Sequence, residues 1–180
     1  ITVTAGSATC DLTLITGAAA EATDPSTVDI ADVTVTLGSG GDSLNVASTA
    51  DARELSIDMG AGDDTVTLGG SLTSASATSA GDILVGGDGT DTISVTSAIG
   101  NGQAAYTGMS GFEAVSFSNA LAAAATIANY QAGLNTVTLA AGANAGTLNL
   151  EAGSNTVNIG ASLAGQLTVN DTGTATTDTL

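Results

Sequence analysis

Three copies of one short turn motif constrain the fold of this chain more than any other feature. Each copy has the form x-G-x-G-x-D-x-(apolar)-x, and the copies are LGSGGDSLN at 37–45, MGAGDDTVT at 59–67 and GGDGTDTIS at 86–94. Their aspartates, Asp42, Asp64 and Asp91, are 22 and 27 residues apart. Each motif lies between two short runs in which apolar residues alternate with Thr, Ser, Asn or Asp. This alternation is typical of a strand with one buried face.

Such runs recur along most of the chain, and each is closed by a cluster of Gly, Asp or Asn. In the second half, NTVTL and NTVNI begin 20 residues apart, at Asn135 and Asn155. A period near twenty with two strands per period indicates stacked coils. We therefore predict an all-β fold, a right-handed parallel β-solenoid (β-roll or β-helix) with Gly/Asp turns, about 20 residues per coil and little helix. The expected strands are 33–37, 43–46, 55–59, 65–68, 82–85, 92–95, 114–118, 136–139, 147–150, 156–159 and 166–169.

The chain is interpreted as one elongated solenoid segment, 1–180, of a larger protein. Two segments break the repeat spacing and are expected to bulge as loops, and an Ala-rich stretch is expected to be a short helix or an irregular coil. These three are 69–81, 97–111 and 119–129. The segment thus divides into metal-binding coils at 33–95, an irregular insertion at 97–129 and metal-poor Asn/Thr coils at 130–180.

The charge and composition exclude several classes of function. The formal net charge is -17, with one basic residue, so nucleic acid and anionic membrane surfaces are not expected partners. With no His and only Cys10, disulfides, zinc sites and His- or Cys-based catalysis are not expected. A glycosidase is not expected either, because Glu113 has no second acidic residue at a defined spacing to form the catalytic pair. No apolar run reaches the roughly 18 residues of a membrane span. We expect no enzyme, no catalytic residue and no membrane insertion.

The turn motif instead has the chemistry of a cation site. Its glycines permit crowded or left-handed backbone conformations that aim several carbonyls at one point. The aspartate ends the turn and faces the same point. In a stack of coils, a hard cation between two turns gathers carbonyls from both and the carboxylate. Calcium, which accepts about 6–8 oxygens in tolerant geometry, suits this arrangement better than magnesium does. Half of the 18 acidic residues lie in 38–91, and only four lie in 101–180.

The motif resembles the nonapeptide of the repeats-in-toxin family, whose parallel β-rolls bind calcium between turns. By this resemblance, Asp42, Asp64 and Asp91 are the carboxylate ligands of several calcium ions. Asp63 and Asp88 are candidate additional ligands, whereas Asp58 and the group around Arg53 are expected to be solvated. Asn135 and Asn155 replace the aspartate in later coils, where a stacked amide ladder is expected instead of metal. The backbone ligands implied by the resemblance are Gly38, Gly40, Gly60, Gly62, Gly87 and Gly89.

A broader likeness concerns the succession MGAGDDTVTL, GGDGTDTISV and GFEAVSFSNA, which looks like the calcium-binding segment of an alphaproteobacterial surface-layer (S-layer) protein. That resemblance implies a structural protein exported by type I secretion to the bacterial cell surface. There it would fold with calcium and self-associate into a lattice. A cell-surface glycan is the candidate anchor of the protein. The alternatives are a repeat segment of a large secreted adhesin or biofilm-matrix protein, and the non-catalytic calcium module of a secreted hydrolase. Ordinary turn chemistry for the aspartates and an ice-binding threonine face are the remaining alternatives, and neither is favoured.

Overall fold

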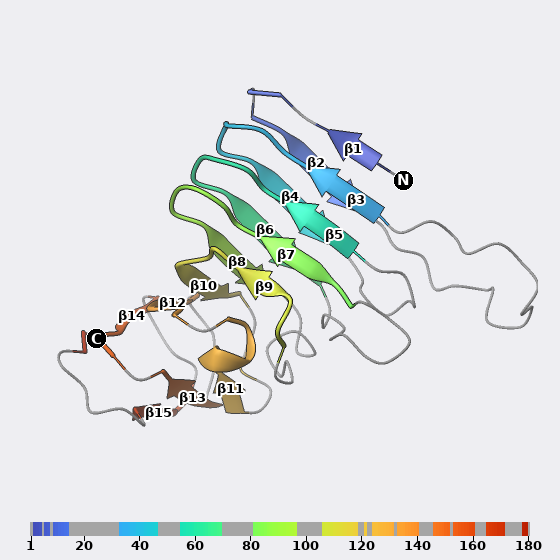
Figure 1. Cartoon of the computed structure of the whole chain (residues 1–180). Helices are drawn as coiled ribbons and strands as arrows, with labels where there is room; N and C mark the ends of the chain where they lie inside the picture. The colour runs from blue at the N-terminus through green and yellow to red at the C-terminus, as the bar shows by residue number, and fades with distance from the viewer. Residues whose placement is uncertain are drawn as a thin grey trace, which may run out of the picture.

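The computed structural model of the chain is a parallel β-solenoid, as the repeat period predicts (Figure 1). Each regular coil contributes one strand to a five-stranded sheet, passes through a turn and contributes the next strand to a seven-stranded sheet. The structure describes residues 2–4, 6–7, 9–14, 33–46, 55–69, 81–96, 106–118, 121, 124–131, 133–140, 146–151, 153–160, 165–171 and 178–179. The predicted loop at 69–81 and the group Asp51, Arg53 and Glu54 lie almost wholly outside these residues.

The five-stranded sheet runs through the first half of the chain, and all of its strand pairs are parallel. In the order in which they pair, its strands are β1 (Thr2–Thr4), β3 (Val33–Thr36), β5 (Leu55–Asp58), β7 (Ile83–Val85) and β9 (Met109–Ser110).

The seven-stranded sheet is continuous through both halves of the chain. Its strands, again in order of pairing, are β2 (Asp11–Leu14), β4 (Ser43–Val46), β6 (Thr65–Leu68), β8 (Thr92–Val95), β10 (Ala114–Phe117), β12 (Thr136–Leu139) and β14 (Thr156–Ile159). The pairs place Ser43, Thr65, Thr92, Ala114, Thr136 and Thr156 in one column, so successive coils contain 22, 27, 22, 22 and 20 residues.

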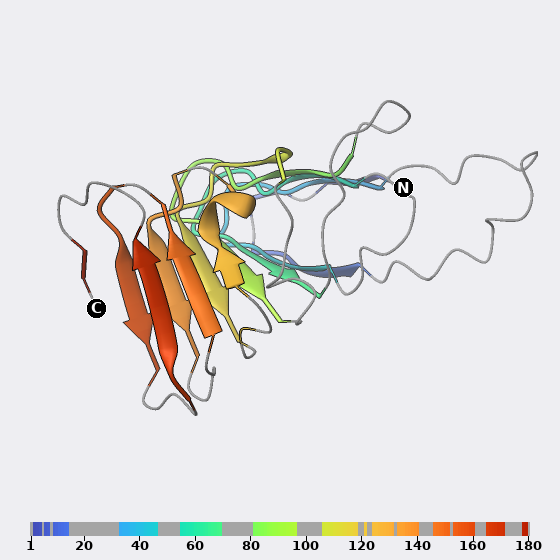
Figure 2. The ribbon, with the colours of Figure 1, turned by 90° about the horizontal axis from the view of Figure 1, so that it is seen from below.

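A third sheet succeeds the five-stranded one in the C-terminal coils. It contains β11 (Ala124–Thr126), β13 (Gly146–Leu150) and β15 (Leu167–Asp171), and a single 3₁₀ turn, η1 (Ile127–Asn129), follows β11. The C-terminal strands and the first strands lie at opposite ends of the stack (Figure 2). Each of the eleven predicted strands is present, with boundaries within two residues. Four short strands were not predicted: β1, β2, β9 and β11.

The strands β9 and β11 lie in stretches that the sequence marked as irregular. Met109–Ser110 falls within the predicted loop 97–111, and its pairing with β7 corrects that prediction there. Ala124–Thr126 falls within the Ala-rich 119–129, which the structure describes as a strand and one 3₁₀ turn rather than as a longer helix. A two- or three-residue strand is too short for alternation to be visible in sequence.

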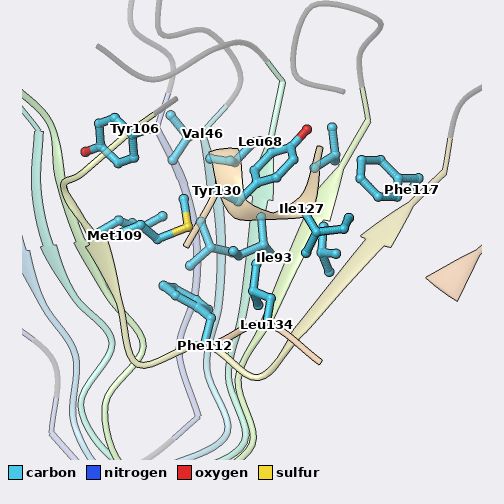
Figure 3. Packing of buried hydrophobic residues seen from close by; sticks show 14 of the residues in the cluster. Val46, Leu68, Ile93, Tyr106, Met109, Phe112, Phe117, Ile127, Tyr130 and Leu134 are labelled. Carbon is cyan, nitrogen blue, oxygen red and sulfur yellow. The ribbon is translucent and has the colours of Figure 1, made fainter. Parts of the chain in front are cut away.

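The core is narrow and aliphatic in the first coils and widens near the middle of the molecule. Val35, Leu44 and Val66 are fully buried, as their inward positions in alternating strands require. All four aromatic residues are buried together around β9, β10 and η1 (Figure 3), and Phe117 and Tyr130 meet edge to face with ring centroids 5.9 Å apart. The Tyr106 hydroxyl donates to the main-chain carbonyl of Asp82. Large rings fill the space where the five-stranded sheet ends.

Within the described residues, the structure contains no helix with the length and apolar character that crossing a bilayer requires.

Candidate functional site

The three motif aspartates lie in one vertical column at an edge of the solenoid. Each directly precedes a strand of the seven-stranded sheet, and the turns that carry them are stacked along one side of the molecule (Figure 1). Parallel pairing of β4, β6 and β8 in register sets this alignment, because Ser43, Thr65 and Thr92 are direct partners. The sequence prediction that the three aspartates stack is therefore confirmed.

The column extends beyond the three aspartates in both directions. Cys10 precedes β2, Glu113 precedes β10, and Asn135 and Asn155 precede β12 and β14. Asp178 occupies the next position, since Thr179 forms a parallel bridge with Thr156. We call this set the edge column; its members are Cys10, Asp42, Asp64, Asp91, Glu113, Asn135, Asn155 and Asp178.

A directional ladder of hydrogen bonds connects the acidic part of the edge column. The main-chain N–H groups of Cys10 and of the three motif aspartates each donate to the carboxylate of the member in the next coil. Asp42 Oδ1 accepts from Cys10 N at 2.7 Å, and Asp64 Oδ1 accepts from Asp42 N at 2.6 Å. Asp91 Oδ1 accepts from Asp64 N at 2.9 Å, and Glu113 Oε2 accepts from Asp91 N at 2.8 Å. One oxygen of each carboxylate thus joins two coils.

The second oxygen of each motif aspartate is buried without a hydrogen-bond partner. Asp42, Asp64 and Asp91 are only 2%, 1% and 0% exposed, and their Oδ2 atoms are the buried side-chain atoms of the described residues that lack a partner. An unsatisfied buried polar atom costs about 1–3 kcal/mol, and more when it is charged. Each of the three atoms therefore needs a positively charged or hydrogen-bond-donating neighbour, and the three occupy equivalent positions in successive coils.

Burial and mutual repulsion make ionisation of these carboxylates unfavourable. Burial is the main cause that raises the pKa of Asp64, and the charges of Asp42 and Asp63 add to it. Burial likewise raises the pKa of Asp91, with the charges of Asp64, Glu113 and Asp63 contributing. In both cases the hydrogen bond from the preceding coil opposes the rise. A bound cation would remove both costs, because it replaces the lost hydration and cancels the repulsion.

The motif glycines allow the turns of successive coils to approach closely, and several of them also adopt the positive φ that the turn requires. Gly87 has φ +114° and lies directly against the coil above, where an added Cβ would collide with the Gly60 carbonyl. Gly60, Gly62 and Gly89 share this positive φ, whereas Gly38 and Gly40 do not. At Gly38 the reason for glycine is crowding, because an added Cβ would collide with the Gly6 carbonyl. The turns also bond directly to each other: Gly38 O accepts from Ala61 N at 2.8 Å, and Gly60 O accepts from Asp88 N at 3.0 Å.

Asp63 and Asp88 differ from the column aspartates, since both are exposed. Asp63 Oδ1 accepts from Thr90 N at 2.9 Å, and the main chain of Asp88 pairs with Ala61. Asp58 is exposed and accepts from Gly60 N within its own turn at 3.1 Å. These carboxylates lie on the outer surface of the turns rather than in the buried column.

The donor set has the chemistry that a hard cation requires, because its free atoms are buried carboxylate oxygens that recur at the same position in successive coils. In the part of the chain that the structure describes, no three His, Cys, Asp or Glu side chains converge enough to hold a metal by themselves. Carbonyl oxygens would have to complete the shell, and a carbonyl that accepts one hydrogen bond retains a second lone pair. The residues that would hold calcium are Asp42, Asp64 and Asp91 with the neighbouring turn carbonyls.

Two acidic members of the column were not recognised from sequence. Glu113 lies 22 residues after Asp91, the same spacing as from Asp42 to Asp64, so the repeat register was the signal that could have identified it. Asp178 is 23 residues after Asn155 and accepts from Asn155 N at 3.0 Å. Asp82, buried at the other edge of the coil, accepts from Leu55 N at 3.0 Å and had no motif to mark it.

The expected amide ladder between Asn135 and Asn155 is not formed. The Asn155 amide donates within its own turn, to Glu151 O at 2.9 Å and Gly153 O at 3.1 Å. Asn135 is exposed, and its Oδ1 accepts from the hydroxyl of Thr136. An amide ladder lies instead on the third sheet, where Asn170 Nδ2 donates to Asn149 Oδ1 at 2.9 Å.

Comparison of the chain with protein-family models, with curated proteins and with solved structures finds no match in any of the three.

Proposed function

We propose that this chain is a structural, calcium-binding solenoid segment of a secreted bacterial surface-layer protein. The observation that carries the proposal is the column of three buried carboxylates, each with one oxygen that lacks a partner. Three such atoms destabilise the fold unless a cation or a hydrogen-bond donor satisfies them. A chain of net charge -17 also attracts cations from its surroundings.

Calcium binding and folding are then one equilibrium. Before the coils stack, Asp42, Asp64 and Asp91 are hydrated and separate. Stacking them without a cation removes water from three carboxylates and brings like charges together, so the stacked state is disfavoured. Calcium supplies charge compensation to that state alone, which couples metal binding to coil formation. The acidic coils of such a chain stay loose in the calcium-poor cytosol and wind up in the calcium-rich exterior, which suits export through a type I channel.

Self-association into a lattice follows from the architecture of a solenoid. The strand β2 is at one edge of the seven-stranded sheet, and β15 is at one edge of the third sheet. Edge strands offer backbone hydrogen-bonding groups to another chain. Each end of the stack can therefore contact another copy of the chain. A molecule with two such interfaces can assemble into ordered arrays.

A calcium titration of the metal-free protein tests the proposal. We expect far-UV circular dichroism to show a gain of β signal with added CaCl₂, and negative-stain electron microscopy to show two-dimensional sheets at saturation. Asp64→Ala and Asp91→Ala should weaken both responses, and Asp58→Asn, at an exposed turn carboxylate, should leave them unchanged.

The outcomes separate the parts of the proposal. Absence of a calcium-dependent signal, or a signal that Asp64→Ala and Asp91→Ala leave intact, would contradict calcium binding at the column. Normal calcium-dependent folding of a protein that stays monomeric would contradict the lattice role, and would favour a repeat segment of a secreted adhesin.

A further inference from the structure

The turn at 86–91 is the only one of the three GxGxD turns that begins with glycine. In the two coils above, the equivalent positions are Leu37 and Met59, whose side chains are buried at 4% and 0% exposure. The equivalence follows from the strand register, since Thr36 pairs with Asp58 and Asp58 pairs with Val85. At the level of Gly86, therefore, the residue that supplies a buried apolar side chain in the upper coils supplies no side chain.

Two oxygen atoms approach the space beside Gly86. A Cβ built on Gly86 would collide with the carbonyl oxygen of Gly111 and would lie 2.8 Å from Asp91 Oδ2. Asp91 Oδ2 is one of the three buried atoms without a partner. A main-chain carbonyl from one coil and an unpartnered carboxylate oxygen from the coil above thus face the same small volume.

A shortened turn brings these groups together. Six residues, 86–91, connect β7 to β8, but only three, 111–113, connect β9 to β10. The shorter turn places Gly111, with φ +71°, against Gly86. Glu113 follows directly, and its longer side chain reaches up so that Oε2 accepts from Asp91 N at 2.8 Å. The Glu113 carboxylate therefore contacts the main chain of Asp91, whose Oδ2 atom lies beside Gly86 together with the Gly111 carbonyl.

We propose that the cation held by Asp91 lies at this junction, where Asp91, Glu113 and the Gly111 carbonyl together bind one hard divalent cation of the Ca²⁺ type. The inference rests on the proposed function, because it assumes that the edge column binds calcium. It goes beyond the turn motif, since neither Glu113 nor Gly111 belongs to any GxGxD copy. The two carboxylates together carry the charge that balances a divalent ion. In each upper coil the one motif aspartate supplies only half of that charge. Six to eight oxygens in flexible geometry favour calcium over magnesium, so water and further carbonyls would complete the shell.

Isothermal titration calorimetry of CaCl₂ into the metal-free protein tests the site. Glu113→Gln keeps an oxygen that can accept from Asp91 N but removes the charge. We expect it to abolish one calcium-binding event or to weaken it about tenfold or more, with the remaining events unchanged. Glu151→Gln is the matched control, because Glu151 Oε2 also accepts a main-chain N–H from the neighbouring coil, that of Gly133 at 2.7 Å, but lies outside the edge column. The control should bind calcium as the unaltered protein does.

The result distinguishes this inference from the proposed function. Calcium binding with the same stoichiometry and affinity in Glu113→Gln as in the unaltered protein overturns the junction site and leaves the column intact. Failure of the unaltered protein to bind calcium overturns both. Circular dichroism at saturating calcium checks that the variant folds. If it does not, Glu113→Asp decides, since it keeps the charge at shorter reach: a weakened site is expected, and unaltered affinity contradicts the proposal.

Discussion

The acidic coils and the asparagine coils place different side chains at the same position of the same fold. Asp64 and Asn155 both precede a strand of the seven-stranded sheet, and both are almost fully buried, at 1% and 4% exposure. In each case one neighbouring coil is joined through a carboxylate: Asp64 Oδ1 accepts from Asp42 N, and Asp178 Oδ1 accepts from Asn155 N. The two regions differ in what the side chain at the column position bonds to.

The Asn155 amide satisfies its own turn, whereas the aspartates leave an atom unsatisfied. Asn155 Nδ2 donates to the carbonyls of Glu151 and Gly153, so two turn carbonyls have a hydrogen-bond donor without any bound ion. Asp64 has no donor to offer, and its Oδ2 atom lacks a partner. A cation beside Asp64 would bind both the carboxylate and turn carbonyls, which is the task that the NH₂ group performs in the asparagine coil. The comparison therefore predicts which coils depend on metal and which do not.

Removing the charge from all three aspartates should have the largest effect. In CaCl₂ at about 100 times Kd, each occupied site adds about 2.7 kcal/mol to the free energy of unfolding. For a chain of this size that corresponds to roughly 5–10 °C in Tm per site. We expect the unaltered protein to show this rise over its value in EDTA. The combined variant Asp42→Asn, Asp64→Asn and Asp91→Asn should have nearly equal Tm in the two buffers, as measured by differential scanning calorimetry. An equal calcium-dependent rise in both proteins would refute the comparison.

The reverse substitution, asparagine to aspartate, should make the stability of the asparagine coil depend on calcium. Asn155→Asp removes both turn hydrogen bonds and buries a carboxylate, so the free energy of unfolding in EDTA should fall by about 2–3 kcal/mol. Calcium should restore part of this loss. Urea denaturation of the variant in EDTA and in CaCl₂ measures both values, and Asn135→Asp, at an exposed member of the column, is the control. A loss that calcium leaves unchanged would show that the turn at 151–155 lacks the ligands of the acidic coils.

The pH dependence of stability should have opposite sign with and without calcium. The pKa values of Asp64 and Asp91 are raised in the folded state, so the folded chain binds protons more tightly than the unfolded chain. Without metal, stability should therefore fall as pH rises from about 4, the ordinary aspartate pKa, through the raised values in the folded state. With calcium the ionised carboxylates are the binding form, so stability should rise with pH over the same window. Thermal melts between pH 4 and pH 7.5 in EDTA and in CaCl₂ measure this, and parallel curves would contradict it.

The amide ladder on the third sheet should contribute least and should be independent of calcium. Asn170 is exposed and donates to Asn149 Oδ1, which makes it a cross-strand pair on a solvated face. Asn170→Ala should lower the free energy of unfolding by about 0.5 kcal/mol, equally in EDTA and in CaCl₂. A calcium-dependent cost for this variant, measured by urea denaturation, would mean that metal binding extends into the C-terminal coils.

Sequence reasoning was strongest where a local pattern repeats. The alternation in VTVT at β3 and in TVTL at β6 and β12 predicted strands that the structure confirms almost to the residue, with inward residues buried and outward residues partly exposed. The 22- and 27-residue spacings predicted that Asp42, Asp64 and Asp91 stack. Where the repeat shortens or loses its apolar alternation, prediction failed, as at Met109–Ser110 and Ala124–Thr126.

Sequence by itself determined the solenoid, its coil period and the alignment of the motif aspartates, because side-chain alternation and turn residues act over a few neighbouring positions. Only the tertiary structure decided that the Glu113 carboxylate accepts from Asp91 N, that Gly111 meets Gly86 and that each motif aspartate keeps one buried oxygen without a partner. These facts depend on contacts between coils, and the residues involved are 22 to 27 positions apart with turns of unequal length between them. Burial of a carboxylate is set by the coils above and below it, so no local pattern around Asp64 or Asp91 could have revealed it.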